Sequence, residues 1–254
     1  MSDEVIVERD GGVLALTLNR PQVRNAINEA AAQAIAAAMA ELDGSPELSV
    51  AVLTGAGQTF CAGMDLKAFL AGERPSVPGR GFAGLVENPP AKPVIAAVEG
   101  AAVAGGFEIA LACDLIVAAE DARFGLPEVR RGLVAAGGGL LRLPRHVPYH
   151  LAVEWALTGD YLSAAAAQAA GLVSRVTPPG EALDQAIELA RHIARNGPLA
   201  VTATKRILAE SQDWPMTEAF DRQRQITEHV RASADAREGA RAFVEKRAPR
   251  WQGR

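Results

Sequence analysis

PVIAAVEGAAVAGGFEIALACDLIVAA, residues 93–119, is the part of the sequence that most constrains the fold. Val94–Val98 is a short apolar run typical of a buried strand. Gly105 and Gly106 interrupt the pattern, residues 107–113 then have the spacing of a helix, and residues 115–117 form a second extended run. A strand, a helix and a second strand in this order predict one unit of a parallel α/β core.

The same stretch is apolar enough to be compared with a transmembrane helix. Glu99, Glu108 and Asp114 interrupt it, and glycines at positions 100, 105 and 106 break it further. Acidic side chains are costly inside a bilayer, so we expect no membrane span here. We expect Asp114 to have a structural role, which leaves the question of why so apolar a segment contains Glu108.

Upstream, the chain predicts a hairpin, a helix and another strand. Residues 5–8 and 13–18 alternate between apolar and polar around a turn at Asp10-Gly11-Gly12, and the motif NRP at 19–21 ends the second strand. Asn28 is a good N-cap for a helix that continues to about Asp43. Residues 48–53 then have the apolar character of a strand.

Downstream of about residue 140, the chain is mostly helical. We predict helices over residues 149–157, 164–170, 181–195, 199–210 and 216–230, and an extended segment over residues 172–176. Pro198 and Pro215 separate the last helices. The C-terminal third therefore forms a helical layer.

Composition and charge narrow the class of protein. Of the 254 residues, 49% are hydrophobic and 22% are charged, which is typical of a globular protein. The net charge of −4 provides no chain-wide basic field for nucleic acid or a membrane surface. Residues 1–9 contain three acids and no apolar core, so we expect no signal peptide. Cys61 and Cys113 have neither metal-type spacing nor a disulfide framework, which favours a reducing cytoplasm.

Four glycine-containing segments could carry chemistry, namely residues 55–66, 100–114, 124–128 and 137–139. Ala62-Gly63 and Gly105-Gly106 place glycine where a backbone can approach a ligand, and the second pair opens a predicted helix, whose first N–H groups are free. Two such N–H groups converging on a thioester carbonyl would form an oxyanion hole. Glycine pairs are also common in tight turns, so their spacing alone leaves both interpretations open.

Two glutamates could supply acid and base chemistry beside such a hole. Glu108 lies just inside the predicted helix among apolar neighbours, and Glu128 follows Pro127 after a strand-like stretch. Adding water to an activated double bond requires a base for the water and an acid for the carbon, and two neighbouring carboxyl groups can provide both. Burial would raise the pKa of at least one of them. Both glutamates also have interpretations without chemistry. Glu108 could simply be an acid placed favourably at a helix N-terminus, and Glu128 could be a solvated loop residue.

These motifs together resemble the enoyl-CoA hydratase/isomerase, or crotonase, superfamily. FCAGMDL at residues 60–66 resembles the crotonase loop, and residues 92–100, 105–108 and 124–128 resemble the second signature region. NRP at 19–21 with Asn25-Ala26, and LTGD at 157–160 before AGLV at 170–173, are similar to the same family. The resemblance extends over nearly the whole chain.

The resemblance implies a fold and an assembly. The fold would be the α/β crotonase (ClpP-like) superhelix of repeated ββα turns, with a core domain over residues 1–195 and a C-terminal helical trimerisation region over residues 196–254. The protein would be a cytoplasmic homotrimer or a hexamer built as a dimer of trimers. Its partner would be an acyl-CoA thioester substrate, with no nucleic acid and no membrane.

The resemblance also implies the site residues. The amides of Ala62 and Gly105 would form the oxyanion hole, and Glu108 and Glu128 match the two catalytic glutamates of hydratases. The predicted substrate- and CoA-binding residues are Arg24, Ala26, Ala62, Gly63, Met64, Asp65, Leu66 and Gly105, together with Phe243 and Lys246, which would reach the CoA of a neighbouring subunit. No metal and no redox cofactor would be required, because CoA is part of the substrate.

The presence of both glutamates favours an enoyl-CoA hydratase, a lyase of fatty acid and lipid metabolism that reversibly converts a 2-enoyl-CoA to a 3-hydroxyacyl-CoA. Residues 81–85, 140–144 and 242–254 look similar to carnitinyl-CoA dehydratase, so that activity is one alternative, and an enoyl-CoA isomerase is another. A non-catalytic acyl-CoA-binding protein is the alternative from another class, although a binder has no need of two acids in an apolar pocket.

Ala104 and Ala135 differ from the glycine and the proline often found at these positions in the family. Residues 70–82 would set the acyl group.

Other kinds of site are disfavoured. The pattern GAG at 55–57 lacks a third glycine and a clear helix, as a dinucleotide site would require, and the sequence contains no Gly-x-Ser-x-Gly elbow of an α/β-hydrolase. Pro148 separates His146 from His150, which disfavours a helical zinc pair. Residues 237–254 carry six basic and two acidic side chains, which we interpret mainly as a solvated helix end.

Overall fold

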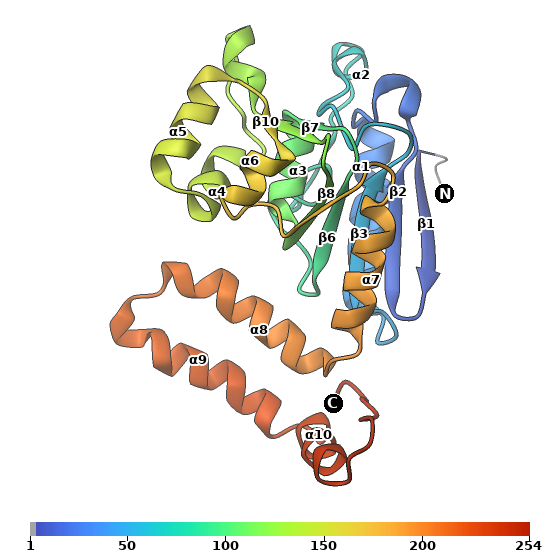
Figure 1. Ribbon diagram of the computed structural model, residues 1–254, viewed down its shortest axis with the longest axis vertical. Helices are drawn as coiled ribbons and strands as arrows, with labels where there is room; N and C mark the ends of the chain where they lie inside the picture. Colours follow the sequence, from blue (N-terminus) through green and yellow to red (C-terminus); the bar gives the residue numbers. More distant parts are fainter. Residues whose placement is uncertain (1–3) are drawn as a thin grey trace.

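A six-stranded sheet with strand order β1-β2-β3-β6-β8-β11 forms the centre of the computed structural model, which describes residues 4–254 (Figure 1). Residues 1–3 lie outside the described residues. They include the start of the predicted core domain and of the N-terminus that we expect to lack a signal peptide. β1 (Val5–Asp10) and β2 (Val13–Leu18) form the predicted antiparallel hairpin. The parallel strands that follow are β3 (Val50–Gly55), β6 (Val94–Val98), β8 (Leu115–Ala119) and β11 (Arg175–Thr177).

Helices cover both faces of this sheet, because successive strand residues point to opposite sides. Ala51 and Leu53 of β3 face a large core with α1 (Glu29–Gly44) and α3 (Gly105–Ala112). Val50 and Val52 face α7 (Ala182–Ala194), which packs through its alanines at positions 182, 186 and 190. The strands β3 and β6 are therefore buried along their whole length, as parallel strands usually are.

A second sheet of short strands positions the site. It contains β7 (Ala101–Val103), β9 (Arg123–Gly125) and β10 (Leu162–Ser163) in the order β10-β9-β7. β7 follows β6 directly and leads into α3, while β9 follows β8 and leads into the 3-10 helix η2 (Pro127–Arg131). Each unit is thus a strand of the first sheet, a strand of the second sheet and a helix, which confirms the predicted ββα pattern.

The remaining elements of the first 195 residues surround these sheets. They are η1 (Pro21–Val23), α2 (Leu66–Leu70), the two-stranded hairpin β4 (Ser76–Val77) and β5 (Gly81–Phe82), and the helices α4 (Gly139–His146), α5 (Tyr149–Thr158) and α6 (Ala164–Ala169). In Figure 1, α4, α5 and α6 lie beside the second sheet, and α2 lies at the end opposite to α10.

The last helices extend away from the sheet (Figure 1). They are α8 (Pro198–Glu210), the 3-10 helix η3 (Ser211–Asp213), α9 (Met216–Arg231) and α10 (Ala234–Val244). The chain then folds back, because Nε1 of Trp251 donates to the Arg195 carbonyl at 2.8 Å and the Asp235 carboxylate accepts the amides of Gln252 and Gly253. Over residues 4–254, no helix is long and apolar enough to cross a membrane.

Most of the predicted elements are confirmed, although several differ in their bounds; the strand predicted over residues 48–53, for example, spans Val50–Gly55. The predicted helix at residue 107 begins at Gly105, two residues earlier. The extended segment predicted over residues 172–176 is wrong in its first half, because the amides of Leu172 and Val173 bond back to the Ala167 carbonyl at the end of α6. Asn28 is the expected N-cap of α1, and its Oδ1 accepts the Ala31 amide at 3.0 Å.

Candidate active site

Short backbone pairings bring the two glycine motifs together. The Cys61 amide donates to the Ala101 carbonyl and the Val103 amide donates to the Cys61 carbonyl, both at 3.1 Å. The two segments that follow this pairing therefore run side by side, one toward Gly63 and the other toward Gly105. A Cβ atom on Gly63 would lie only 2.9 Å from the Gly105 nitrogen, and Gly63 has φ +92°, so glycine is required there on both counts.

The two backbone amides proposed for the oxyanion hole differ in their present partners. The Gly105 amide opens α3 and donates no hydrogen bond to any of residues 4–254. The Ala62 amide donates to the Arg24 carbonyl at 3.0 Å. A ligand oxygen can thus meet a free helix N-terminal donor at Gly105, but it must share or replace the Arg24 carbonyl at Ala62.

Glu108 is buried at the first turn of α3, with 4% of its surface exposed. Its Oε1 accepts the Gly139 amide at 3.0 Å. Burial raises the pKa of Glu108 above its ordinary value, although hydrogen bonds from the backbone of Gly139 and Gly137 and the nearby Arg142 cation act in the opposite direction. The apolar segment therefore contains a buried carboxyl group that accepts a backbone hydrogen bond.

The glycine segment at 137–139, whose purpose the sequence did not reveal, encloses Glu108. A Cβ atom at Gly137 would lie 2.6 Å from Oε2 of Glu108, and one at Gly139 would lie 2.9 Å from its Cγ. A side chain at either position would displace the Glu108 side chain from its present place, so glycine allows this close approach of the backbone to Glu108.

Glu128 lies in η2 and is half-buried. Within residues 4–254 its Oε2 is a buried oxygen without a hydrogen-bond partner. Burial raises the pKa of Glu128, its own backbone amide acts to lower it, negative charge on Glu108 raises it further, and Arg131 acts to lower it. The two glutamates are therefore close enough to affect each other electrostatically, and burial favours the protonated form of both.

The predicted CoA-binding residues before and after Ala62 lie close together. The Ile27 amide donates to the Gly63 carbonyl at 2.8 Å, and the Asp65 amide donates to the Ile27 carbonyl at 2.9 Å, so residues 24–27 run alongside residues 62–65. Arg24 is exposed and Ala26 is buried. Of the remaining members, Met64 is half-buried and Leu66 is exposed at the start of α2.

Phe243 and Lys246 are separated from the glutamates within one chain. Phe243 lies in the last turn of α10 and Lys246 follows two residues after its end, and Figure 1 places α10 at the opposite end of the molecule from α2. Phe243 is 86% exposed. Within one chain, these side chains therefore lie far from the end of the molecule that holds α2.

Phe82, which sequence reasoning treated only as part of a loop, lies next to one of the proposed oxyanion-hole residues. A Cβ atom on Gly105 would lie 2.6 Å from its Cε1 and 2.8 Å from its Cζ. The ring is thus placed directly against the backbone of Gly105. Its position is fixed by its neighbours, because Gly84 packs against the Ala32 carbonyl of α1 and Arg142 donates to the Val86 carbonyl.

The other acids of the apolar segment have structural roles. Asp114 accepts the Val94 amide at 2.8 Å and pairs with Lys205 at 2.7 Å, as expected, and Glu99 accepts the amides of Gly180 and Ala182 before α7. His146 and His150 are exposed and belong to different helices. Over residues 4–254, no group of three or more His, Cys, Asp or Glu side chains is arranged to hold a metal ion.

Comparisons with known proteins give one consistent family. The model of the family described as Enoyl-CoA hydratase/isomerase matches residues 8–254. Enoyl-CoA hydratase EchA19 of Mycobacterium tuberculosis is 44% identical over 262 residues, covering 99% of this chain and 97% of that protein. Carnitinyl-CoA dehydratase of Salmonella typhi is 44% identical over 263 residues, with full coverage of both. The crystal structure of enoyl-CoA hydratase EchA1 from Mycobacterium marinum has a TM-score of 0.98 and 58% identity, again over both whole chains.

Proposed function

The chain belongs to the enoyl-CoA hydratase/isomerase family, and we propose that it is an enoyl-CoA hydratase that adds water reversibly to a 2-enoyl-CoA through Glu108 and Glu128. The observation that carries the proposal is the pair of electrostatically coupled carboxyl groups beside the free amide of Gly105. A protein that only bound acyl-CoA would gain nothing from two acids whose ionisation burial opposes.

The thioester oxygen would accept hydrogen bonds from the amides of Gly105 and Ala62. Charge develops on this oxygen when water adds to the β carbon, and fixed donors stabilise that charge without reorganisation. Gly105 adds the partial positive charge of the N-terminus of α3. Ala62 would exchange its bond with the Arg24 carbonyl for one with the substrate.

The two glutamates would divide the proton transfers between them. The charged form of Glu108 is stabilised by the Gly139 amide and by the nearby Arg142 cation. Glu108 therefore takes a proton from the water molecule while the water oxygen bonds to the β carbon. Glu128, whose protonated form is favoured by burial and by negative charge on Glu108, gives a proton to the α carbon. Proton exchange between the two groups restores the starting state, and dehydration is the same sequence reversed.

CoA would lie along residues 24–27 and 62–65, where Arg24, Ala26, Gly63, Met64, Asp65 and Leu66 come together. The Asp65 side chain pairs with Arg20 and caps α2, so we assign its contribution to its backbone. The loop at residues 70–82 would set the acyl group, with Phe82 as the wall beside Gly105. The mechanism calls for no metal or redox cofactor.

A second candidate is the dehydration of carnitinyl-CoA. The Salmonella typhi carnitinyl-CoA dehydratase matches this chain at the same 44% identity as the Mycobacterium tuberculosis hydratase. The same two carboxyl groups would serve that reaction, with only the acyl pocket changed.

We propose that the working form is a homotrimer or a dimer of trimers in the cytoplasm. Large apolar side chains on α9 are uncovered, with Met216 79% and Phe220 67% exposed, as expected for faces that another copy covers. Lys246 and Phe243 would then reach the CoA of a neighbouring subunit. The two buried free thiols, Cys61 and Cys113, suit a reducing compartment.

A substrate panel tests this function. Purified protein would be incubated with crotonyl-CoA, with longer 2-enoyl-CoA esters and with carnitinyl-CoA, and products would be identified by their mass. We expect gain of one water by at least one enoyl ester; preferential loss of water from carnitinyl-CoA would select the second candidate. Binding of every ester without turnover would contradict both and favour an acyl-CoA-binding protein.

A further inference from the structure

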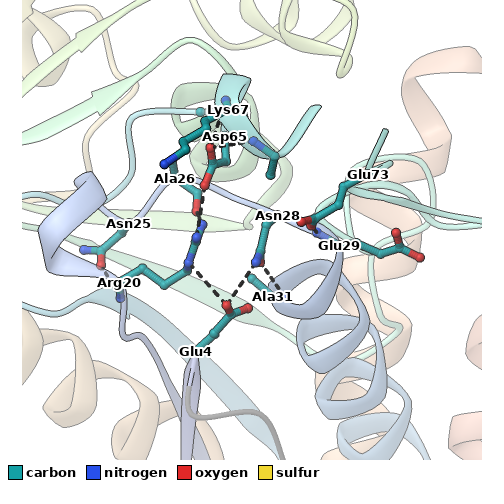
Figure 2. Close-up of polar contacts among 12 residues, drawn as sticks. Glu4, Arg20, Asn25, Ala26, Asn28, Glu29, Ala31, Asp65, Lys67 and Glu73 are labelled. Carbon is teal, nitrogen blue, oxygen red and sulfur yellow. Dashed lines mark hydrogen bonds and ion pairs between the residues drawn. The ribbon is translucent and has the colours of Figure 1, made fainter. Parts of the chain in front are cut away.

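A half-buried polar cluster joins Glu4, Ala26 and Asp65 around the side chain of Arg20 (Figure 2). Nη1 of Arg20 donates to the Ala26 carbonyl, Nη2 pairs with Oδ2 of Asp65 at 3.0 Å, and Nε lies 3.5 Å from Oε1 of Glu4. One planar guanidinium therefore joins three separate parts of the chain, which a lysine ammonium could not do in the same geometry.

The Arg20–Asp65 pair is protected from solvent. The exposed fractions of the two side chains are 14% and 11%, so their attraction is screened much less than that of a surface pair. Burial acts to raise the pKa of Asp65, but hydrogen bonds from Ala68, Arg20 and Lys67 outweigh it and leave the pKa below its ordinary value. Asp65 is consequently charged at neutral pH.

Arg20 contacts both of the segments that run side by side at the site. It binds the residue 24–27 segment at Ala26 and the residue 62–65 segment at Asp65. Between these two contacts, the Ile27 amide bonds to the Gly63 carbonyl and the Asp65 amide bonds to the Ile27 carbonyl. The bond between the Ala62 amide and the Arg24 carbonyl lies at the start of both segments, before these two bonds.

We propose that Arg20 is a positioning residue for the oxyanion hole, which keeps residues 62–65 in place against residues 24–27 while the Ala62 amide exchanges the Arg24 carbonyl for the thioester oxygen. The inference rests on the proposed hydratase function. Without Arg20, the same exchange would loosen the whole segment, and Gly63, packed closely against Gly105, would shift with it.

Asp65→Asn is the most selective test. Oδ1 of Asp65 accepts the amides of Lys67 and Ala68 at 3.1 Å, and an asparagine oxygen can continue to cap α2 in this way. Oδ2, which faces Arg20, would become an NH₂ group opposite another donor. Arg20→Lys is the second variant, since it keeps the charge but loses the planar fork. Arg9→Met, which breaks the exposed Arg9–Glu41 pair, is the control.

Two readouts separate positioning from a general structural role. The first is kcat and KM for crotonyl-CoA. The second is the red shift of a bound 4-dimethylaminocinnamoyl-CoA, a chromophore whose absorption moves when its carbonyl is polarised. We expect Asp65→Asn and Arg20→Lys to lower kcat by about 10- to 100-fold, as small misplacements of a reacting group do. KM should change little and the red shift should decrease, while Arg9→Met should match the wild type.

A folded Asp65→Asn protein with wild-type kcat and red shift would overturn the proposal. So would a rise in KM with kcat and red shift unchanged, because Arg20 would then serve CoA binding alone. If Arg20→Lys does not fold, Asp65→Asn, which leaves Arg20 and the cap in place, decides. If the wild type hydrates no ester, the hydratase function fails, but the red shifts of wild type and Asp65→Asn still test the role of Arg20.

Discussion

The Gly139 amide nitrogen lies 3.0 Å from Oε1 of Glu108, and no comparable donor from another residue reaches Oε2 of Glu128 among residues 4–254. This difference gives two neighbouring carboxyl groups different tasks. A carboxylate with a backbone donor is stabilised in its charged form, whereas a buried carboxyl oxygen without a partner favours the protonated form. The segment at 137–139 provides this donor because glycine allows its backbone to touch the Glu108 side chain.

Glu128→Gln should stabilise the fold at neutral pH. Because the folded-state pKa of Glu128 is raised, the stabilisation it offers is complete below its unfolded pKa and is lost as the pH rises through its folded pKa. Glutamine removes the free-energy cost that burial places on the charged form of Glu128, and at pH 7 we expect about 1 kcal/mol of added stability, as for other relieved active-site residues. Thermal unfolding at pH 7 and pH 4 checks this, since the gain should shrink at the lower pH. The exposed Glu47→Gln should change stability at neither pH, and a destabilised Glu128→Gln at pH 7 would contradict the prediction.

Gly63→Ala should abolish most turnover. The added Cβ would lie 2.9 Å from the Gly105 nitrogen, at the proposed oxyanion hole, and we expect a loss in kcat on the order of 100-fold, as when an oxyanion donor is removed. Gly72→Ala is a matched control, because Gly72 has φ +99° with no atom within 4 Å of the added Cβ. Both variants should lose about 1–3 kcal/mol of stability through backbone strain, but only the first should lose activity. Equal kcat values for the two would be evidence against the hole.

Ala104→Gly should increase stability. Ala104 has φ +52° and ψ −130°, a conformation that strains a residue with a Cβ atom, and its own Cβ would be 3.1 Å from one on Gly63. Relief of strain should exceed the entropy cost of glycine, giving a net gain of about 1 kcal/mol in denaturant unfolding. Ala169→Gly, in the exposed part of α6, should instead lose about 1 kcal/mol. A loss at both positions would mean that Ala104 carries no strain.

Phe82→Ala should broaden the range of acyl groups. The ring packs against Gly105, so its removal opens space beside the thioester carbonyl. We expect kcat/KM for long or branched enoyl-CoA esters to rise relative to crotonyl-CoA by about tenfold, since one or two methylene groups in a pocket contribute about 1–3 kcal/mol. Phe69→Ala, in α2 and 39% exposed, is the control and should leave the profile unchanged. An unchanged profile in Phe82→Ala would remove Phe82 from the acyl pocket.

Local chemistry explains which elements could be predicted from the sequence. The hairpin of β1 and β2 has alternating side chains around two glycines, and Asn28 caps α1 through an atom three residues away. By contrast, α4 was not predicted, because its N-cap is Gly138 and Pro144 lies inside it. Contacts of Gly139 and Leu143 with the core decide that helix. The three-residue strands β7 and β9 are too short to have a periodicity.

The site was predictable where it matched the family motifs and not where it depends on distant pairing. Glu108 and Glu128 could be proposed from the sequence, although their electrostatic coupling could not. Arg20 and Asp65 are far apart in the chain, and no spacing rule links them. That the Ala62 amide bonds to the Arg24 carbonyl also follows only from the way residues 24–27 lie against residues 62–65.

The central claim, that two carboxyl groups act together, is tested most directly by crotonyl-CoA hydration in the wild type, Glu108→Gln and Glu128→Gln. Loss of the ultraviolet absorbance of the conjugated thioester measures the rate. Glutamine cannot exchange protons, although at position 108 it keeps an oxygen for the Gly139 amide. Each variant should therefore lose several orders of magnitude in turnover, more than the about 10²–10⁴-fold typical of losing one acid or base. Each variant should still bind acyl-CoA. Near-normal turnover in a folded Glu108→Gln or Glu128→Gln protein would contradict the account.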